Sequence, residues 1–161
     1  HRWKEGEGLS VFLRPAGYMG SEPAGRELGT NGLVFDSQDR LVMADHGNRQ
    51  IARLDESNFT RTTLADRYEG KRLNSPNDLV IHSNGDIYFT DPPYGLEKNW
   101  DDPARELDFC GVYRLSKDGK LTLGIGSAAT GWHAACTISR WQGERRGSRT
   151  LINSIIPQAA S

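Results

Sequence analysis

A repeat with a spacing of 46 residues constrains the fold of this chain more than any other feature of its sequence. The segment NGLVFDSQDRLVMAD (residues 31–45) aligns without a gap with NDLVIHSNGDIYFTD (residues 77–91). Each copy begins with Asn, crosses a polar turn at a shared Ser between two apolar runs, and ends at Asp. Two short strands joined by a tight turn explain this pattern, and its recurrence predicts stacked copies of one β-unit.

A second pattern accompanies the first. Residues 1–13 (HRWKEGEGLSVFL), 52–64 (ARLDESNFTRTTL) and 113–123 (YRLSKDGKLTL) each combine a strand that carries an Arg, a polar turn and another strand. Asn84-Gly85 and Asp118-Gly119 are residue pairs favoured in hairpin turns. Four strands in about 40 to 50 residues is the period of a propeller blade. The sequence therefore predicts an all-β chain that forms an incomplete β-propeller of about two to three blades.

Composition agrees with a loop-rich β-protein and excludes some partners. The chain has 18 glycines, and 36% of its residues are hydrophobic. A formal net charge of −1 argues against a nucleic-acid partner. No apolar run approaches membrane-spanning length, so we expect no membrane partner either. We expect further residues ahead of His1 in the complete protein, and the compartment, cytoplasmic or periplasmic, therefore stays open.

Residues 124–161 differ in character from residues 1–123. They show no alternation of apolar and polar residues and no Asn-Gly or Asp-Gly pair, and their middle part is rich in Arg. One set of codons for residues 137–143 (TISRWQG), when read one base later, encodes the blade-like hairpin Leu-Ser-Pro-Asp-Gly-Lys. We therefore predict a partial propeller over 1–123 and an aberrant tail over 124–161, an out-of-frame translation of the next blade. A divergent but genuine C-terminal segment is the alternative.

Three segments carry a resemblance to a known family: residues 31–54, residues 64–96 with the motif NSPND…GDIYFTDPPYGL, and residues 106–122. They resemble the gluconolactonase branch of the senescence-marker-protein/gluconolactonase family, and the resemblance covers residues 1–123. It implies a six-bladed propeller with one divalent metal at the top of the central tunnel. Calcium is the expected ion, with Mg²⁺ or Zn²⁺ as alternatives, and a sugar lactone is the expected substrate.

The resemblance implies one metal ligand in this chain. Asn77, at the start of an expected inner strand, matches the family's Asn ligand. A Glu ligand, a later Asn and Asp, and the catalytic carboxylate are expected in blades that this chain lacks, so no catalytic residue is identified. A single Asn cannot hold calcium, which takes about six to eight oxygens. A turn in which the Asn77 side chain caps the backbone is the alternative.

The direction of the strands predicts which residues surround Asn77. If one strand starts at Asn77 and the next returns to Asp91, the residues after Asp91 emerge on the same face, and the previous copy contributes its equivalents. We expect substrate-binding roles for Asn31, His46, Asp78, Asp91 and Tyr94. Each has an alternative. Asn31 is equally consistent with a capping turn, His46 with a solvated loop residue, and Asp91 with a structural role. Asp78 binds the ion through water or orients Asn77.

The expected function is a metal-dependent lactonase that opens a sugar lactone by ester hydrolysis. Propellers host many functions, so two alternatives stay open. One is a non-enzymatic propeller fragment that binds sugars or proteins. The other is an inactive truncated product, which the missing ligands favour for the 161-residue chain itself.

Overall fold

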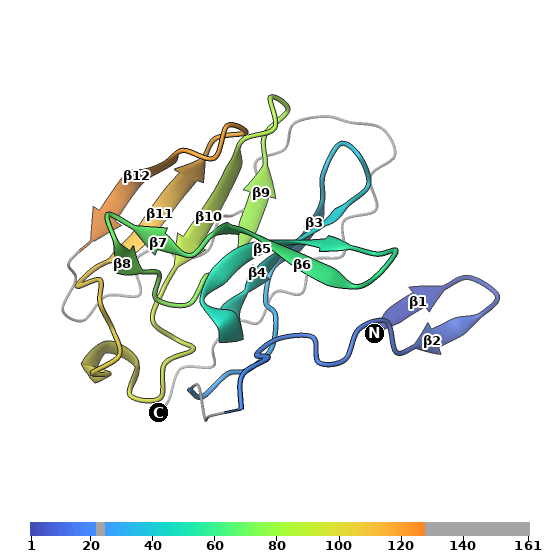
Figure 1. The fold of residues 1–161 in the computed structure, drawn as a ribbon, viewed down its shortest axis with the longest axis horizontal. Coiled ribbons are helices and arrows are strands. Elements are labelled where there is room, and N and C mark those ends of the chain that lie inside the picture. The colour runs from blue at the N-terminus through green and yellow to red at the C-terminus, as the bar shows by residue number, and fades with distance from the viewer. Residues whose placement is uncertain (22–24, 128–161) are drawn as a thin grey trace, which may run out of the picture.

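The computed structural model describes residues 1–21 and 25–127, which contain two four-stranded antiparallel sheets (Figure 1). The first sheet has the order β3 (Leu33–Phe35), β4 (Leu41–Asp45), β5 (Gln50–Asp55) and β6 (Thr60–Ala65). The second has the order β9 (Leu79–Ile81), β10 (Ile87–Asp91), β11 (Cys110–Leu115) and β12 (Leu121–Ser127). Each sheet is a meander in which neighbouring strands follow one another in sequence. The prediction of an all-β, incomplete propeller is confirmed.

Smaller elements connect and flank these two blades. A hairpin of β1 (Arg2–Lys4) and β2 (Gly8–Ser10) stands apart from both sheets (Figure 1). A second short hairpin, β7 (Arg67–Tyr68) and β8 (Lys71–Arg72), lies between the blades in sequence. Two 3₁₀ turns, η1 (His46–Asn48) and η2 (Asn99–Asp101), follow β4 and β10 respectively. Among the described residues, no helix has the length and apolarity that crossing a membrane requires.

The inner hairpins of the two blades turn in the same way, as the repeat predicts. Asp39, in the turn between β3 and β4, has a φ of 56°, and Gly85, at the equivalent position of the second blade, has a φ of 93°. Gly119 takes a φ of 84° in the turn between β11 and β12. Glycine adopts this conformation without steric cost, and the short polar side chain of Asp tolerates it. The turn residues therefore fix the register of each hairpin.

The predicted domain boundary at residue 123 falls inside a strand. Strand β12 continues past Leu123 to Ser127 and stays paired with β11, where Gly126 lies opposite Gly111. The rest of the predicted tail, residues 128–161, lies outside the described residues. Its out-of-frame origin stays a prediction.

An apolar cluster joins the two blades. Ile51 from the first blade and Phe89 and Tyr113 from the second are fully buried members of this cluster. The rings of Phe89 and Tyr113 stack with their centroids 5.2 Å apart, and Tyr68 tilts onto Tyr113 at the same centroid distance. Burial of aromatic rings contributes most of the stabilisation in such a cluster. The larger apolar cluster of the described chain therefore lies at the contact between its two blades, and a smaller one packs Phe12 and Leu13 against the first blade alone.

Truncation of Phe89 tests this assignment of the core. We expect Phe89→Ala to lower the free energy of unfolding by about 3–5 kcal/mol, because it removes a buried ring and leaves a cavity. Phe35→Ala is the matched control, since Phe35 is 54% exposed on β3, and we expect a change of about 0.5 kcal/mol or less. Urea unfolding followed by circular dichroism measures both. Equal losses would contradict a core between the blades.

Candidate functional site

The inner strands of the two blades start side by side, and two asparagines meet there. Asn31 precedes β3 and Asn77 precedes β9, at the same position of the repeat. The Asn31 Nδ2 amide donates to Asn77 Oδ1 at 2.5 Å. The backbone N–H of Gly32 donates to the Asn77 carbonyl at 2.8 Å. The structure thus brings together two of the residues that the sequence placed around one mouth.

The backbone explains why both side chains project at this end. Asn31 N–H donates to the Ala44 carbonyl and Asn77 N–H to the Thr90 carbonyl, each at 2.9 Å, so the ladder of each hairpin continues past its inner strand. Gly32 permits the close approach of the blades, because a Cβ there would lie 3.0 Å from Asp78 Oδ1. Asn77 Oδ1 accepts a hydrogen bond from the Asn31 amide rather than from the backbone of its own loop. This pairing distinguishes it from a simple capping turn.

Asp78 follows Asn77 and lies beside Gly32. Its Oδ1 accepts the N–H of Leu79 at 2.9 Å, and its own N–H donates to Thr90 Oγ1 at 3.2 Å. Burial raises the pKa of the Asp78 carboxyl, and the single N–H from Leu79 opposes that rise. Asp78 therefore places a half-buried carboxylate next to the asparagine pair.

His46 is a buried residue, and the alternative of a solvated loop histidine is wrong. It begins η1 directly after β4, and only 2% of its surface is exposed. Its Nδ1 lies 3.1 Å from the carbonyl of Pro76, and its Nε2 lies 3.4 Å from Glu27 Oε2. Burial lowers the pKa of His46, opposed by the Pro76 carbonyl and by the Glu27 and Asp45 carboxylates. The side chain thus links the first blade to the loop that carries Asn77.

Asp91 is fully buried and points back into the protein. Its Oδ2 accepts the N–H of Asn74 and its Oδ1 the N–H of Ser75, both at 2.8 Å. Burial raises the pKa of Asp91 to about 7, against the two N–H donors and the Arg49 guanidinium, which favour the ionised form. With both oxygens engaged, Asp91 holds the loop ahead of Asn77. This is the structural alternative that its place before two prolines suggested.

Tyr94 lies in the loop after β10 and is half-buried. Burial raises the pKa of its hydroxyl. The neighbouring Gly95 donates its N–H to Ser75 Oγ at 2.9 Å, so this loop packs against the loop that leads to Asn77. Tyr94 therefore stands at the same end of the blades as the asparagine pair.

Two features of this end of the blades were not predicted from the sequence. Arg49 is buried and ties distant loops together, with Nε donating to the Leu73 carbonyl at 2.7 Å and Nη1 to the Ala104 carbonyl at 3.0 Å. Residues 97–106, which are rich in charged side chains, form a folded loop in which Asp102 accepts the N–H groups of Lys98 and Ala104. Arginine is rarely buried unless it is paired, so the residue type gave no signal for this role of Arg49.

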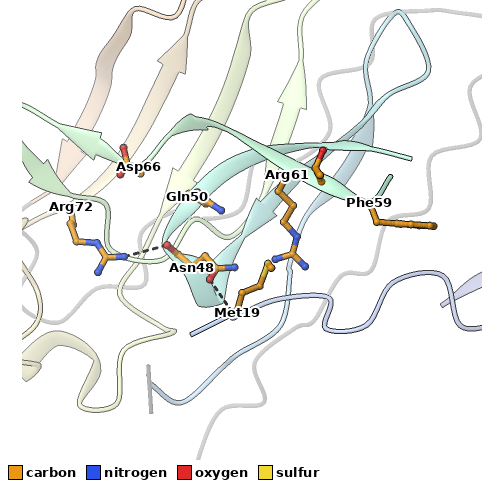
Figure 2. A pocket seen from close by; sticks show the side chains of 8 residues that line it. Met19, Asn48, Gln50, Phe59, Arg61, Asp66 and Arg72 are labelled. Carbon is orange, nitrogen blue, oxygen red and sulfur yellow. Dashed lines mark hydrogen bonds between the residues drawn. The ribbon is translucent and has the colours of Figure 1, made fainter. Parts of the chain in front are cut away.

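A separate pocket of about 610 Å³ lies alongside β5 and β6 (Figure 2). Its two arginines already bind carbonyl groups of the protein. Arg61 donates to the carbonyls of Pro15 and Gly17 at 2.6 and 2.7 Å, and Arg72 donates to the carbonyl of Asn48 at 3.3 Å. Arg61 thereby fastens the segment before β3 to the first blade, and Arg72 ties β8 to η1. We therefore place the candidate site at the asparagine pair and not in this pocket.

Comparison with known proteins assigns the chain to a family. Residues 1–130 match the family described as SMP-30/Gluconolactonase/LRE-like region. The chain belongs to this family. A gluconolactonase from Zymomonas mobilis is 43% identical over 124 residues, which are 76% of this chain and 35% of that protein. A solved structure of a gluconolactonase from Xanthomonas campestris is 43% identical, with a TM-score of 0.53 over 60% of this chain and 33% of that one. The chain thus spans about a third of the length of these relatives.

The oxygen donors of this gluconolactonase-family chain suit a hard cation in kind but not in number. The amides of Asn31 and Asn77 and the carboxylate of Asp78 are donors that calcium and magnesium prefer. Three such groups are fewer than the six to eight oxygens that calcium takes. Among the described residues, no group of three or more His, Cys, Asp or Glu side chains gathers in a way that could hold a metal ion.

The buried carboxyl of Asp91 makes stability depend on pH. Its pKa rises from 3.8 to about 7 on folding, so its contribution is fully present below about pH 3.8 and is lost as the pH rises through about 7. We expect the stability difference between the wild type and Asp91→Asn to shrink by about 1.4 kcal/mol per pH unit between pH 5 and 7. Urea unfolding of both proteins across this range measures it. A difference that does not vary with pH would contradict a raised pKa.

Proposed function

We propose that this chain contributes two blades of a metal-assisted lactonase, and that the Asn31–Asn77 pair is its share of the site. The observation that carries the proposal is the contact between the two amides at the starts of adjacent inner strands. Support comes from the relatives, both of which are gluconolactonases at 43% identity. The substrate we propose is a small sugar lactone of the gluconolactone type.

The side chains at this site are suited to binding rather than to bond cleavage. An amide offers both N–H donors and an oxygen acceptor, which match the hydroxyl groups of a sugar lactone. In our proposal the Asn77 oxygen faces a divalent cation, Asn31 orients it, and Asp78 adds a carboxylate beside them. Calcium or magnesium suits these oxygen donors better than zinc. When bound, such an ion polarises the carbonyl of the lactone.

We assign no residue of this chain as the nucleophile or as the base that activates water. Asp91 and His46 are buried and engaged with backbone groups at the described end of the blades. The chain also spans only about a third of its relatives' length. We therefore propose that the catalytic group belongs to another part of the propeller, and that these 161 residues alone bind a ligand without hydrolysing it.

Calcium titration of the chain tests the proposed ligand. We expect weak binding, with a Kd of about 10⁻⁴–10⁻³ M, because few protein oxygens are present. Asn77→Ala should weaken it about tenfold or more, while Asn77→Asp should retain it, since a carboxylate oxygen replaces the amide oxygen. Asn84→Ala, in the turn at the other end of β9, is the matched control. Isothermal calorimetry measures all four proteins, and equal affinities would refute the role of Asn77.

A hydrolysis assay of the same chain with gluconolactone tests whether binding and catalysis belong to different parts of the propeller. We expect acid release at the spontaneous rate, with and without calcium, because the catalytic group is placed elsewhere. A pH-stat assay measures it. Calcium-dependent hydrolysis that Asn77→Ala abolishes would show that the two blades suffice for catalysis, and would contradict the division that we propose.

A further inference from the structure

We propose that His46 is a positioning residue that holds Asn77 in place from the neighbouring blade, through the carbonyl of Pro76. The inference deepens the proposed function, because the placement of Asn77 matters for catalysis only if Asn77 serves the lactonase site. His46 belongs to η1 of the first blade, whereas Pro76 and Asn77 belong to the second. The His46 Nδ1–Pro76 contact, at 3.1 Å, therefore crosses between the blades next to the asparagine pair.

The peptide group between Pro76 and Asn77 is held from both sides. Its carbonyl, that of Pro76, faces His46 Nδ1, and its N–H, that of Asn77, donates to the Thr90 carbonyl at 2.9 Å. Fixing both ends of this planar unit fixes the direction of the N–Cα bond of Asn77, and rotation about that bond then sets where its side chain points. The carbonyl of Asn77 is held in turn by the N–H of Gly32. The Asn77 amide is therefore aimed at Asn31 by three backbone contacts, one of which comes from His46.

The imidazole ring is itself locked in place. A Cβ at Gly95 would lie 2.5 Å from His46 Nε2, so the loop after β10 packs directly on the ring. That loop is tied down by the Gly95 N–H bond to Ser75 Oγ and by the Arg26 N–H bond to the Gly95 carbonyl at 3.0 Å. The His46 side chain is therefore held rigidly where the two blades meet, between the loop after β10 and the loop that carries Pro76. Rigidity of this kind is what a positioning group requires.

The hydrogen bond to Pro76 persists in both protonation states of His46. A carbonyl oxygen only accepts hydrogen bonds, so Nδ1 must carry the hydrogen, and it does so in the neutral tautomer and in the imidazolium alike. Protonation would change only Nε2, which has no hydrogen-bond partner among the described residues and faces the Glu27 carboxylate at 3.4 Å. The charged groups around the ring are Glu27 and Asp45. Positioning by His46 is therefore independent of pH, unlike general acid–base catalysis.

Two substitutions separate the Nδ1 donor from the rest of the ring. In His46→Asn, the side-chain amide can present an N–H close to the position of Nδ1 and keep the bond to Pro76. In His46→Gln, the longer side chain carries its amide toward the position of Nε2 and leaves the Pro76 carbonyl without its donor. His82→Asn is the matched control, because His82 lies beyond the far end of β9, in the turn before Asn84.

Nuclear magnetic resonance of the full ¹⁵N-labelled chain measures the effect. We expect His46→Gln to speed the hydrogen exchange of the Asn77 and Gly32 N–H groups about tenfold, the loss expected for one hydrogen bond. The side-chain amide signals of Asn31 and Asn77 should shift with them. His46→Asn should restore most of the exchange protection and the signals, and His82→Asn should leave both unchanged. The ratio of each variant's exchange rates to those of the wild type should be the same at pH 6 and pH 8.

Other outcomes would overturn the inference. Unchanged exchange at Asn77 and Gly32 in His46→Gln would show that the Pro76 bond positions nothing. Equal loss in His46→Asn and His46→Gln would show that the bulk of the ring matters and not its donor. If His46→Gln does not fold, His46→Asn decides alone: native signals at Asn77 support positioning, and altered ones refute it. Failure of the wild type to bind calcium would refute the proposed function but would leave this result intact.

Discussion

The contact between the two blades is the constraint on which the rest of the structure depends. The strands of the two blades are three to seven residues long and have little stability as isolated sheets, so burial between the two sheets supplies what they lack. Ile51, Phe89 and Tyr113 provide that burial in one apolar cluster. Once the blades pack, the starts of β3 and β9 lie side by side. The asparagine pair and its backbone supports follow from this arrangement, and so does the link made by His46.

A buried carboxylate stands at the same repeat position in both blades, and it binds different groups in each. Asp45 ends β4 and Asp91 ends β10, and both are fully buried. Asp91 accepts two backbone N–H groups of the loop ahead of Asn77. Asp45 instead accepts side-chain donors, from Asn48 and Gln50 at 2.9 Å and from Arg61 at 3.4 Å. The buried acid at the end of the second strand thus fastens the segment that leads into the first strand in the second blade. In the first blade it fastens residues that follow it in the chain.

Much of the fold could be predicted from the sequence, and only part of the site. The 46-residue repeat and the turn residues at Asp39 and Gly85 define local hairpins. Such hairpins can be predicted without the tertiary structure, because they depend on residues that are close in the sequence. The shared face of Asn31 and Asn77 followed from strand direction alone. The burial of His46 could not be foreseen, because it depends on loops packing from other parts of the chain. A structural role for Asp91 was foreseen as an alternative, but the backbone groups that it binds were not. Glu27 had no signal of its own in the sequence.

The sequence by itself determined the pairing inside each blade and the end at which the polar loops gather. Alternation and turn chemistry act between residues that are close in the chain, so these features carry over directly into structure. Only the tertiary structure decided which polar groups remain available at that end. Asp91 and His46 were drawn inside by hydrogen bonds to the backbone, whereas the amides of Asn31 and Asn77 were left to each other. Burial sets the balance between desolvation and hydrogen bonding for each group, and burial is a property of the packed blades.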